Sequence, residues 1–82
     1  MAKGIVLPNE SRKLGSRIEE LRKERDLTRQ QLAEAVGVSR ISIYHYENAR
    51  YPITVEKLLL VSRALGTTID YFLMDLDLDR TR

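Results

Sequence analysis

The stretch from Leu27 to Asn48, L-T-R-Q-Q-L-A-E-A-V-G-V-S-R-I-S-I-Y-H-Y-E-N, decides the fold. Thr28 is a good helix N-cap, and Gln31 three residues later completes a capping-box pattern. Gly37 stands where this first helix must end, because glycine tolerates a positive φ. Ser39 is a second N-cap and predicts a second short helix. Two short helices joined by a tight glycine turn predict a helix-turn-helix, although a generic pair of antiparallel helices shares some of these features.

The second helix, expected to run from Ser39 through Glu47, has two unlike faces. At about 100° per residue, one face carries Ile43, Tyr46 and Glu47. The other carries Ile41, Tyr44, His45 and Asn48, with Arg40 and Ser42 on its flanks. An ordinary surface helix exposes Lys and Glu, whereas this second face offers donors, flat rings and a branched apolar group, which suit base edges, thymine methyls and phosphates in a major groove. The alternative is a helix turned by one residue, which would put Ile41 and Tyr44 in the core.

The composition limits the possible functions. The chain has 82 residues, a length that suits one domain. It contains no cysteine, so disulfides, thiol chemistry and zinc-finger spacing are excluded. The net charge is only +2, but residues 1–63 hold twelve Lys or Arg against eight Asp or Glu, whereas residues 64–82 hold two Arg against four Asp. The basic part coincides with the candidate helix-turn-helix, which is a modest indication of a polyanionic partner.

Enzymatic and membrane functions find little support in the sequence. The chain has one histidine, no cysteine and no glycine-rich phosphate loop, so we identify no catalytic residues and expect neither a metal nor a cofactor. No apolar run approaches the roughly 20 residues that span a bilayer. The apolar run at residues 5–7 stops at Pro8, which makes it too short for the core of a signal peptide. We therefore expect a cytoplasmic, nucleoid-associated protein without a membrane partner.

One longer helix is expected before the helix-turn-helix. It covers residues 12–25, where Leu14, Ile18 and Leu21 recur at helical spacing. Residues 1–11 precede it as an N-terminal arm that docks on the domain or on a second subunit, with a frayed terminus as the alternative.

Two shorter helices are expected after the helix-turn-helix. Thr54 caps a fourth helix. Its inner stripe comprises Leu58, Val61, Ser62 and Leu65. Leu60 falls well outside that stripe. A short fifth helix begins after Thr67 or Thr68, and residues 75–82 form a tail that alternates apolar and acidic residues. The apolar stripes of five short helices can meet in one small core, which leaves the second helix of the helix-turn-helix free to project outward.

The residues from Leu14 to Leu73 resemble the phage-repressor and Cro-like helix-turn-helix family, also called XRE. The matching segments are L-G-S-R-I at 14–18, L-T-R-Q-Q-L-A at 27–33, G-V-S at 37–39, I-Y-H-Y-E-N at 43–48 and A-L-G-T-T-I-D-Y-F-L at 64–73. They match the family in both spacing and residue type. The resemblance implies an all-α, compact, five-helix domain of the lambda-repressor type over residues 12–74, with the helix-turn-helix at its centre.

The resemblance also implies roles for individual residues. Base contacts in the major groove fall to Arg40, Ile41, Tyr44 and His45; a solvent-facing histidine without a special role is the alternative for His45. Phosphate contacts fall to Arg29, Ser39, Ser42, Asn48 and Arg50, with Tyr51 added from the tip of the following loop. Arg22 and Glu47 stand where the family often has an ion pair, and a buried carboxylate needs such a partner. Arg29 replaces a glutamine that is usual in the family.

The leading function is thus a sequence-specific DNA-binding transcriptional regulator. One short helix reads only a few base pairs, so we expect a homodimer on a two-fold-related operator in double-stranded DNA, with half-sites about 34 Å apart. Repression by blocking polymerase is the default, and activation through contact with polymerase is the alternative. The candidate dimer contacts are Leu60, Tyr71, Leu76 and Leu78, which otherwise complete the core of the monomer.

A second class of function is a protein-interaction partner, such as an antitoxin or a co-regulator, whose DNA binding is secondary. The apolar arm and the alternating tail motivate this alternative. A tight protein complex without any preference among DNA sequences would favour it.

Overall fold

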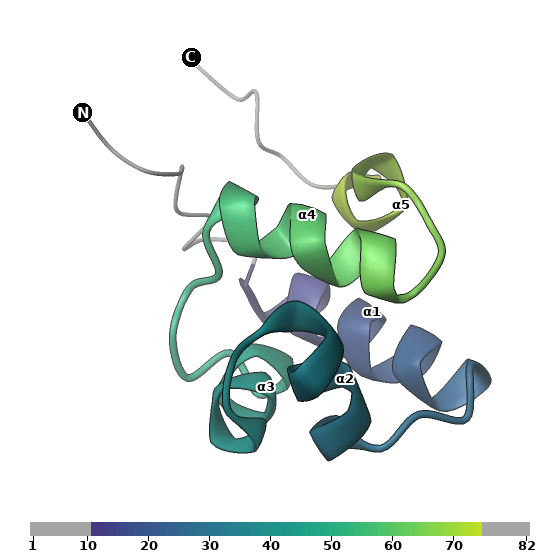
Figure 1. Ribbon diagram of the computed structural model, residues 1–82. Helices are drawn as coiled ribbons and strands as arrows, with labels where there is room; N and C mark the ends of the chain where they lie inside the picture. The colour runs from purple at the N-terminus through teal and green to yellow at the C-terminus, as the bar shows by residue number, and fades with distance from the viewer. Residues whose placement is uncertain (1–10, 75–82) are drawn as a thin grey trace, which may run out of the picture.

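The computed structural model describes residues 11–74, and five α-helices form there. In chain order they are α1 (Ser11–Glu24), α2 (Arg29–Val36), α3 (Arg40–Glu47), α4 (Val55–Ala64) and α5 (Ile69–Leu73), as Figure 1 shows. The predicted all-α fold of five helices is confirmed within these residues. The predicted tail and the arm up to residue 10 lie outside the described residues, and so do the candidate dimer contacts Leu76 and Leu78.

Local signals fix the ends of the helix-turn-helix as predicted. At the start of α2, Gln31 N donates to Thr28 Oγ1 at 3.0 Å and Thr28 N donates to Gln31 Oε1 at 2.8 Å, which completes the capping box. Gly37 ends α2 in the left-handed conformation, with φ at 87°. At the start of α3, Ser42 N donates to Ser39 Oγ at 3.1 Å. The direction in which α3 leaves the turn is therefore set by short-range bonds.

Other helix ends agree less closely with the prediction. α1 begins at Ser11 and ends at Glu24, one residue earlier at each end than expected. Thr54 caps α4 as predicted, because its hydroxyl accepts a hydrogen bond from Lys57 N at 3.2 Å. Thr68 occupies the N-cap position of α5, but its side chain makes no capping hydrogen bond. The short helix α5 therefore depends on packing against the rest of the domain.

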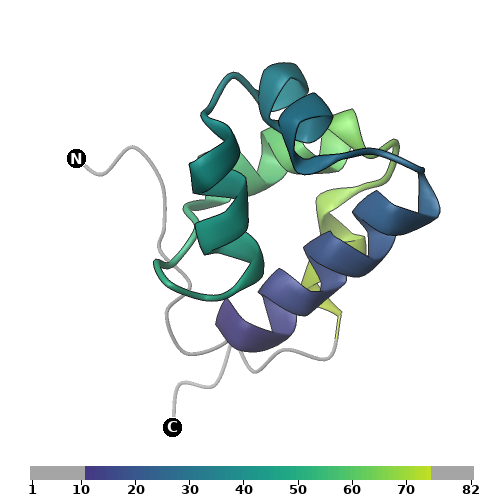
Figure 2. The ribbon, with the colours of Figure 1, turned by 90° about the horizontal axis from the view of Figure 1, so that it is seen from below.

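The core lies where the five helices meet. α4 and α5 cover it from above in Figure 1, and the view from below in Figure 2 shows α1, α2 and α3 around its other side. Its buried apolar side chains are Leu14, Ile18, Leu21, Leu32, Ala33, Val36, Ile43, Ile53, Leu58, Val61, Leu65 and Phe72. The predicted apolar stripes of α1 and α4 are therefore inside. Within residues 11–74, every helix is too short or too polar to cross a membrane.

Leu60 departs from the position predicted for it on α4. Instead of lying well outside the buried stripe, it is half-buried and packs against the core. Ala64 lies one turn later and packs in the same way, so the apolar stripe of α4 is wider than the sequence suggested. The leucine that α4 does expose is Leu59, with 39% of its surface accessible.

α1 and α3 come into close contact at Gly15. A Cβ atom at this position would lie 2.5 Å from the carbonyl oxygen of Tyr46 and 2.6 Å from that of Glu47. Carbon atoms do not approach a backbone oxygen so closely, so a side chain here would push the end of α3 away from α1. A glycine inside a helix costs roughly 0.5–1 kcal/mol relative to alanine, and the close helix contact explains why one is found here.

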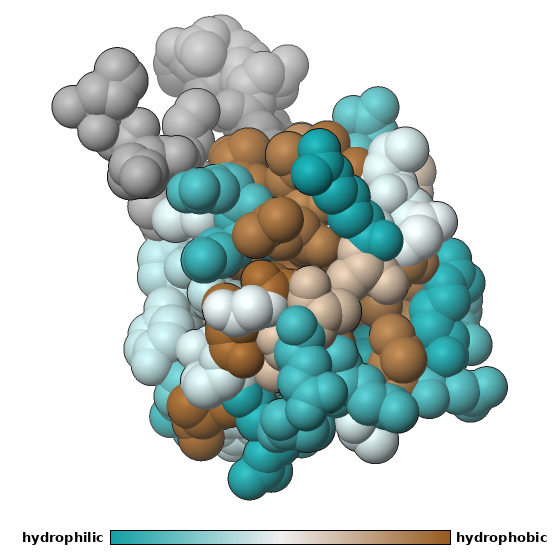
Figure 3. Space-filling view, in the orientation of Figure 1, coloured by the Kyte–Doolittle hydropathy of each residue, from teal (hydrophilic) through white to brown (hydrophobic). Residues whose placement is uncertain are grey.

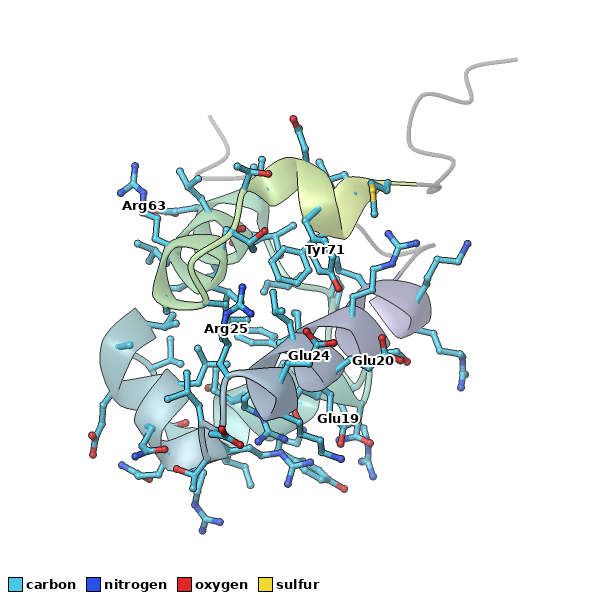
Figure 4. The ribbon with its side chains drawn as sticks, turned by 90° about the vertical axis from the view of Figure 1, so that its right-hand side faces the viewer. Glu19, Glu20, Glu24, Arg25, Arg63 and Tyr71 are labelled. Atoms are coloured by element: carbon cyan, nitrogen blue, oxygen red, sulfur yellow. The ribbon has the colours of Figure 1, made fainter. Side chains whose placement is uncertain are left out.

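Two arginines connect the N-terminal part of the domain to the ends of the last two helices. Arg25, just after α1, donates from Nε to the Leu65 carbonyl at 2.8 Å, and Figure 4 shows its side chain between α1 and α4. Arg17 donates from Nη1 to the Phe72 carbonyl at 3.0 Å. Carbonyl groups at a helix end have no partner within their own helix, so these arginines satisfy groups that α4 and α5 leave open.

Candidate nucleic-acid interface

α3 has one buried and one exposed side. Ile43 is fully buried and Glu47 is 5% exposed, whereas Ile41 is 59% exposed. Tyr44 and His45, on the same side as Ile41, are half-buried. The helix therefore has the predicted orientation, and the alternative that placed Ile41 and Tyr44 in the core is wrong.

Glu47 holds the end of α3 against α1. Arg22 Nε donates to Glu47 Oε2 at 2.6 Å, and Arg22 Nη2 donates to Glu47 Oε1 at 3.2 Å. The remaining nitrogen, Nη1, donates to the Leu27 carbonyl at 2.8 Å. The structure therefore contains the ion pair that the resemblance implies. Both groups are almost fully buried, and two parallel charge-assisted bonds of this kind fix an orientation as well as a distance.

Arg29 is a second partner of Glu47, and sequence reasoning missed this contact. Arg29 Nε donates to Glu47 Oε1 at 2.9 Å, and Arg29 Nη2 lies 3.8 Å from Glu19 Oε2. Its guanidinium also sits over the ring of Tyr44, 5.2 Å from the ring centroid. The first residue of α2 thus reaches both the buried and the exposed side of α3.

Rings and cations follow one another along the exposed side of α3. The ring centroid of His45 lies 5.6 Å from that of Tyr44 and 4.5 Å from that of Tyr51. The guanidinium of Arg50 lies 6.0 Å from the Tyr44 centroid, on which Arg29 also packs. The loop residues Arg50 and Tyr51 are thereby brought next to the predicted base-reading residues. His45 Nδ1 is buried without a hydrogen-bond partner, so only Nε2 of this histidine is left to face a ligand.

An open pocket marks the N-terminal half of the same surface. It has a volume of about 300 Å³ and is lined by Arg29, Arg40, Ile41 and Tyr44. Three of these four residues are predicted base contacts, and the fourth is a predicted phosphate contact. Two guanidinium groups, an aromatic ring and a branched apolar side chain therefore converge on one hollow, which can take both a polar edge and a methyl group.

The remaining polar candidates lie at the two ends of α3. Ser39 Oγ and Ser42 Oγ are 3.0 Å apart at the N-terminus, where the first backbone amides of the helix point outward. Asn48 Nδ2 donates to the Tyr44 carbonyl at 2.9 Å at the C-terminus.

On the inner side of α3, burial raises the pKa of the Tyr46 hydroxyl above its usual value, and the nearby Tyr51 adds to that shift.

The two described dimer candidates lie away from this surface. Leu60 on α4 and Tyr71 on α5 are half-buried and pack against the core. Figure 4 shows Tyr71 beside α1, and its ring centroid lies 5.1 Å from that of Phe72. Their part in a dimer stays a prediction.

Comparison with known proteins places the chain in a family. The family model described as Helix-turn-helix matches residues 18–72. A Rickettsia conorii protein named as the uncharacterized HTH-type transcriptional regulator RC0668 is 41% identical over 64 residues, which are 78% of this chain and 51% of that protein. The chain spans about half the length of the curated relatives that it matches first.

Solved structures agree with this placement. The clp gene regulator ClgR from Corynebacterium glutamicum is 30% identical, superposes with a TM-score of 0.76, and is matched over 78% of this chain and 68% of its own. The P22 c2 repressor, crystallised with a synthetic operator, is 34% identical with a TM-score of 0.69 over 74% of this chain and 92% of its own. The chain therefore belongs to the XRE-type helix-turn-helix family of DNA-binding transcriptional regulators.

Proposed function

We propose that this protein is a transcriptional repressor that binds a two-fold-related operator as a homodimer and reads each half-site with α3. The observation that carries the proposal is the pocket between Arg40, Ile41 and Tyr44 on the exposed side of a helix whose other side is anchored through Glu47. A helix held in this way can enter a major groove without losing its own position.

Four side chains read bases in this proposal. Arg40 donates two hydrogen bonds to O6 and N7 of a guanine, a contact that discriminates by about 1–3 kcal/mol. Ile41 and Tyr44 form the apolar walls that contact a thymine methyl group. His45 donates or accepts through Nε2, because its other nitrogen is buried.

The groups around them hold the phosphates. The amides at the N-terminus of α3, with the hydroxyls of Ser39 and Ser42, face one strand, since a helix N-terminus favours an anion. Asn48, Arg50 and Tyr51 face the backbone at the other end of the helix. Such contacts supply affinity without sequence information. Each phosphate that is neutralised by a cation such as Arg50 contributes about −0.9 to the slope of the logarithm of affinity against the logarithm of salt concentration.

A dimer follows from the short reach of α3. Two half-sites about one helical turn apart double the number of base pairs that are read. The P22 c2 repressor, a structural relative, was crystallised with an operator, which supports the comparison. Figure 3 shows an apolar area over α4, the helix that carries the exposed Leu59. Together with Leu60 and Tyr71, this side of the domain is the proposed contact between subunits.

Selection of bound duplexes from a randomised library tests the proposal. The parent protein should recover a two-fold-related motif, and Arg40→Ala and Tyr44→Ala should each lose preference at different positions of that motif. Arg12→Ala is the control, because Arg12 is exposed in the first turn of α1 and belongs to none of the proposed base, phosphate or dimer contacts. It should recover the parental motif.

Two results would contradict the proposal. If both variants recover the parental motif, α3 does not read the operator through these residues. If the parent recovers no motif at all, the protein-partner class of function, with an antitoxin-type or polymerase partner, becomes the better account. Sedimentation with the selected duplex tests the dimer, because a stoichiometry of one protein per full-affinity site would contradict dimeric binding.

A further inference from the structure

We propose that Arg29 is a positioning residue for Tyr44 rather than a phosphate contact. The resemblance assigns Arg29 to phosphate, but the structure gives its guanidinium other partners. This inference rests on the proposed reading of DNA by Tyr44. In this role Arg29 holds the Tyr44 ring in a fixed orientation before DNA is bound. Arg29 is then a determinant of which operator is preferred.

The guanidinium of Arg29 already has carboxylate partners in the free protein. Its Nε bonds to Glu47, whose side chain is fully buried, and its Nη2 lies within ion-pair distance of Glu19. A phosphate bound through Nε or Nη2 would compete with these two carboxylates, and the Glu47 carboxylate has no access to water. Losing a bond to such a group is costly, because the group cannot replace the bond with a solvent contact.

Arg29 also packs on the ring of Tyr44. The guanidinium carbon lies 5.2 Å from the centroid of the Tyr44 ring, within the range of a cation–π contact. A planar guanidinium can stack on a ring and still donate from its edge, which a lysine ammonium cannot do. Arg29 can therefore bond to Glu47 and cover the Tyr44 ring at the same time.

Arg29 is itself held in place by the start of α2. It is the first residue of α2, directly after the capping box formed by Thr28 and Gln31. Its side chain is one-third exposed, so it is partly enclosed between α1, α2 and α3. The orientation of Tyr44 is thus connected to the helix cap of α2 and to the buried carboxylate of α3, and not to its own helix alone.

The variants Arg29→Lys and Arg29→Met separate positioning from phosphate binding. Lysine keeps the positive charge and binds phosphate well, but it cannot make the stacked and ion-paired arrangement. Methionine keeps the apolar stem and removes the charge. Arg12→Met is the matched control for the loss of one charge, because Arg12 is exposed in the first turn of α1 and belongs to none of the proposed base, phosphate or dimer contacts. Binding is measured on the parental operator and on one altered at the base pair assigned to Tyr44.

If Arg29 positions Tyr44, the Arg29 variants should lose preference between the two operators. The salt dependence of their affinity should show no loss of a phosphate contact. Both Arg29 variants should reduce the ratio of the two affinities by about fivefold, the size expected for a moderate cation–π contact. The salt slope of Arg29→Lys should equal that of the parent, and the salt slope of Arg29→Met should equal that of the Arg12→Met control. In a Tyr44→Leu background, the Arg29 substitutions should no longer change the ratio. The proposal is overturned if Arg29→Lys keeps the ratio while Arg29→Met reduces the magnitude of the slope by about 0.9 more than the Arg12→Met control does.

A measurement without DNA keeps this test independent of the proposed function. The aromatic proton resonances of Tyr44 in the free protein should shift and average in Arg29→Met and should stay unchanged in Arg12→Met. Circular dichroism confirms that each variant is folded. Unchanged Tyr44 resonances in a folded Arg29→Met protein would contradict positioning. A parent protein that binds all duplexes equally, but shows the resonance change, would instead contradict the proposed function and leave the Arg29–Tyr44 contact established.

Discussion

The two sides of α3 are held by different means. Its inner side is closed, because Ile43 is fully buried and Glu47 receives hydrogen bonds from arginines on α1 and α2. On the outer side, Ile41 is mostly exposed, while Tyr44 and His45 make ring and cation contacts at the surface. One helix can thus be fixed to the domain by one side and present side chains to a partner on the other. Substitutions on the inner side should change stability, and substitutions on the outer side should change binding.

The largest effect is expected at Glu47. Glu47→Ala leaves the buried Arg22 without its carboxylate and frees Arg29, so the free energy of unfolding should fall by about 3–5 kcal/mol. Urea denaturation measures this loss. The control is Glu24→Ala, an exposed glutamate on α1 (Figure 4), which should stay within about 0.5 kcal/mol of the parent. A loss below 1 kcal/mol for Glu47→Ala would mean that the bonds from Arg22 and Arg29 to Glu47 contribute little to stability.

The second largest loss of stability is expected for a substitution at Gly15. The added methyl group of Gly15→Ala meets the Tyr46 and Glu47 carbonyls, which have no freedom to move without shifting α3. Overpacking of this kind costs about 1–3 kcal/mol, which outweighs the better helix propensity of alanine. Thermal unfolding of Gly15→Ala and of Ser16→Ala, an exposed site on the same helix, makes the comparison. A stabilised Gly15→Ala protein would show that the close contact between α1 and α3 is absent.

A smaller effect is expected at the helix caps. Thr28→Ala removes a hydroxyl that accepts from Gln31 N and should cost about 1 kcal/mol. Thr68 holds the same position at α5 without a side-chain bond, so Thr68→Ala should cost clearly less. Equal losses in urea denaturation would mean that these threonines act through backbone preference and not through their hydroxyl groups.

Short-range signals in the sequence predicted most of the helix ends and the turn between α2 and α3. The caps at Thr28, Ser39 and Thr54 and the turn at Gly37 depend on residues four positions apart or fewer, so they could be identified without a structure. The two faces of α3 followed from its helical period. The ion pair between Arg22 and Glu47 came from family resemblance, supported by the argument that an inward carboxylate needs a partner.

Contacts between distant parts of the chain were missed. The bond from Arg29 to Glu47 and the contact of Gly15 with α3 join residues that are far apart in sequence, and no local pattern marks either of them. Leu60 was misplaced because the width of a buried stripe depends on the neighbouring helices as well as on period. The positions of the base contacts could be predicted, but the cation and ring contacts that orient them required the fold.

The most direct test of the division between the two sides uses Arg40→Ala. Arg40 is exposed, so its removal should leave the free energy of unfolding within about 0.5 kcal/mol of the parent. On the selected operator, the same substitution should reduce discrimination against a changed guanine by about 1–3 kcal/mol. Both quantities are measured on one preparation, by urea denaturation and by competition binding. Unchanged discrimination, or a loss of stability as large as that of Glu47→Ala, would contradict the assignment of anchoring to one side of α3 and reading to the other.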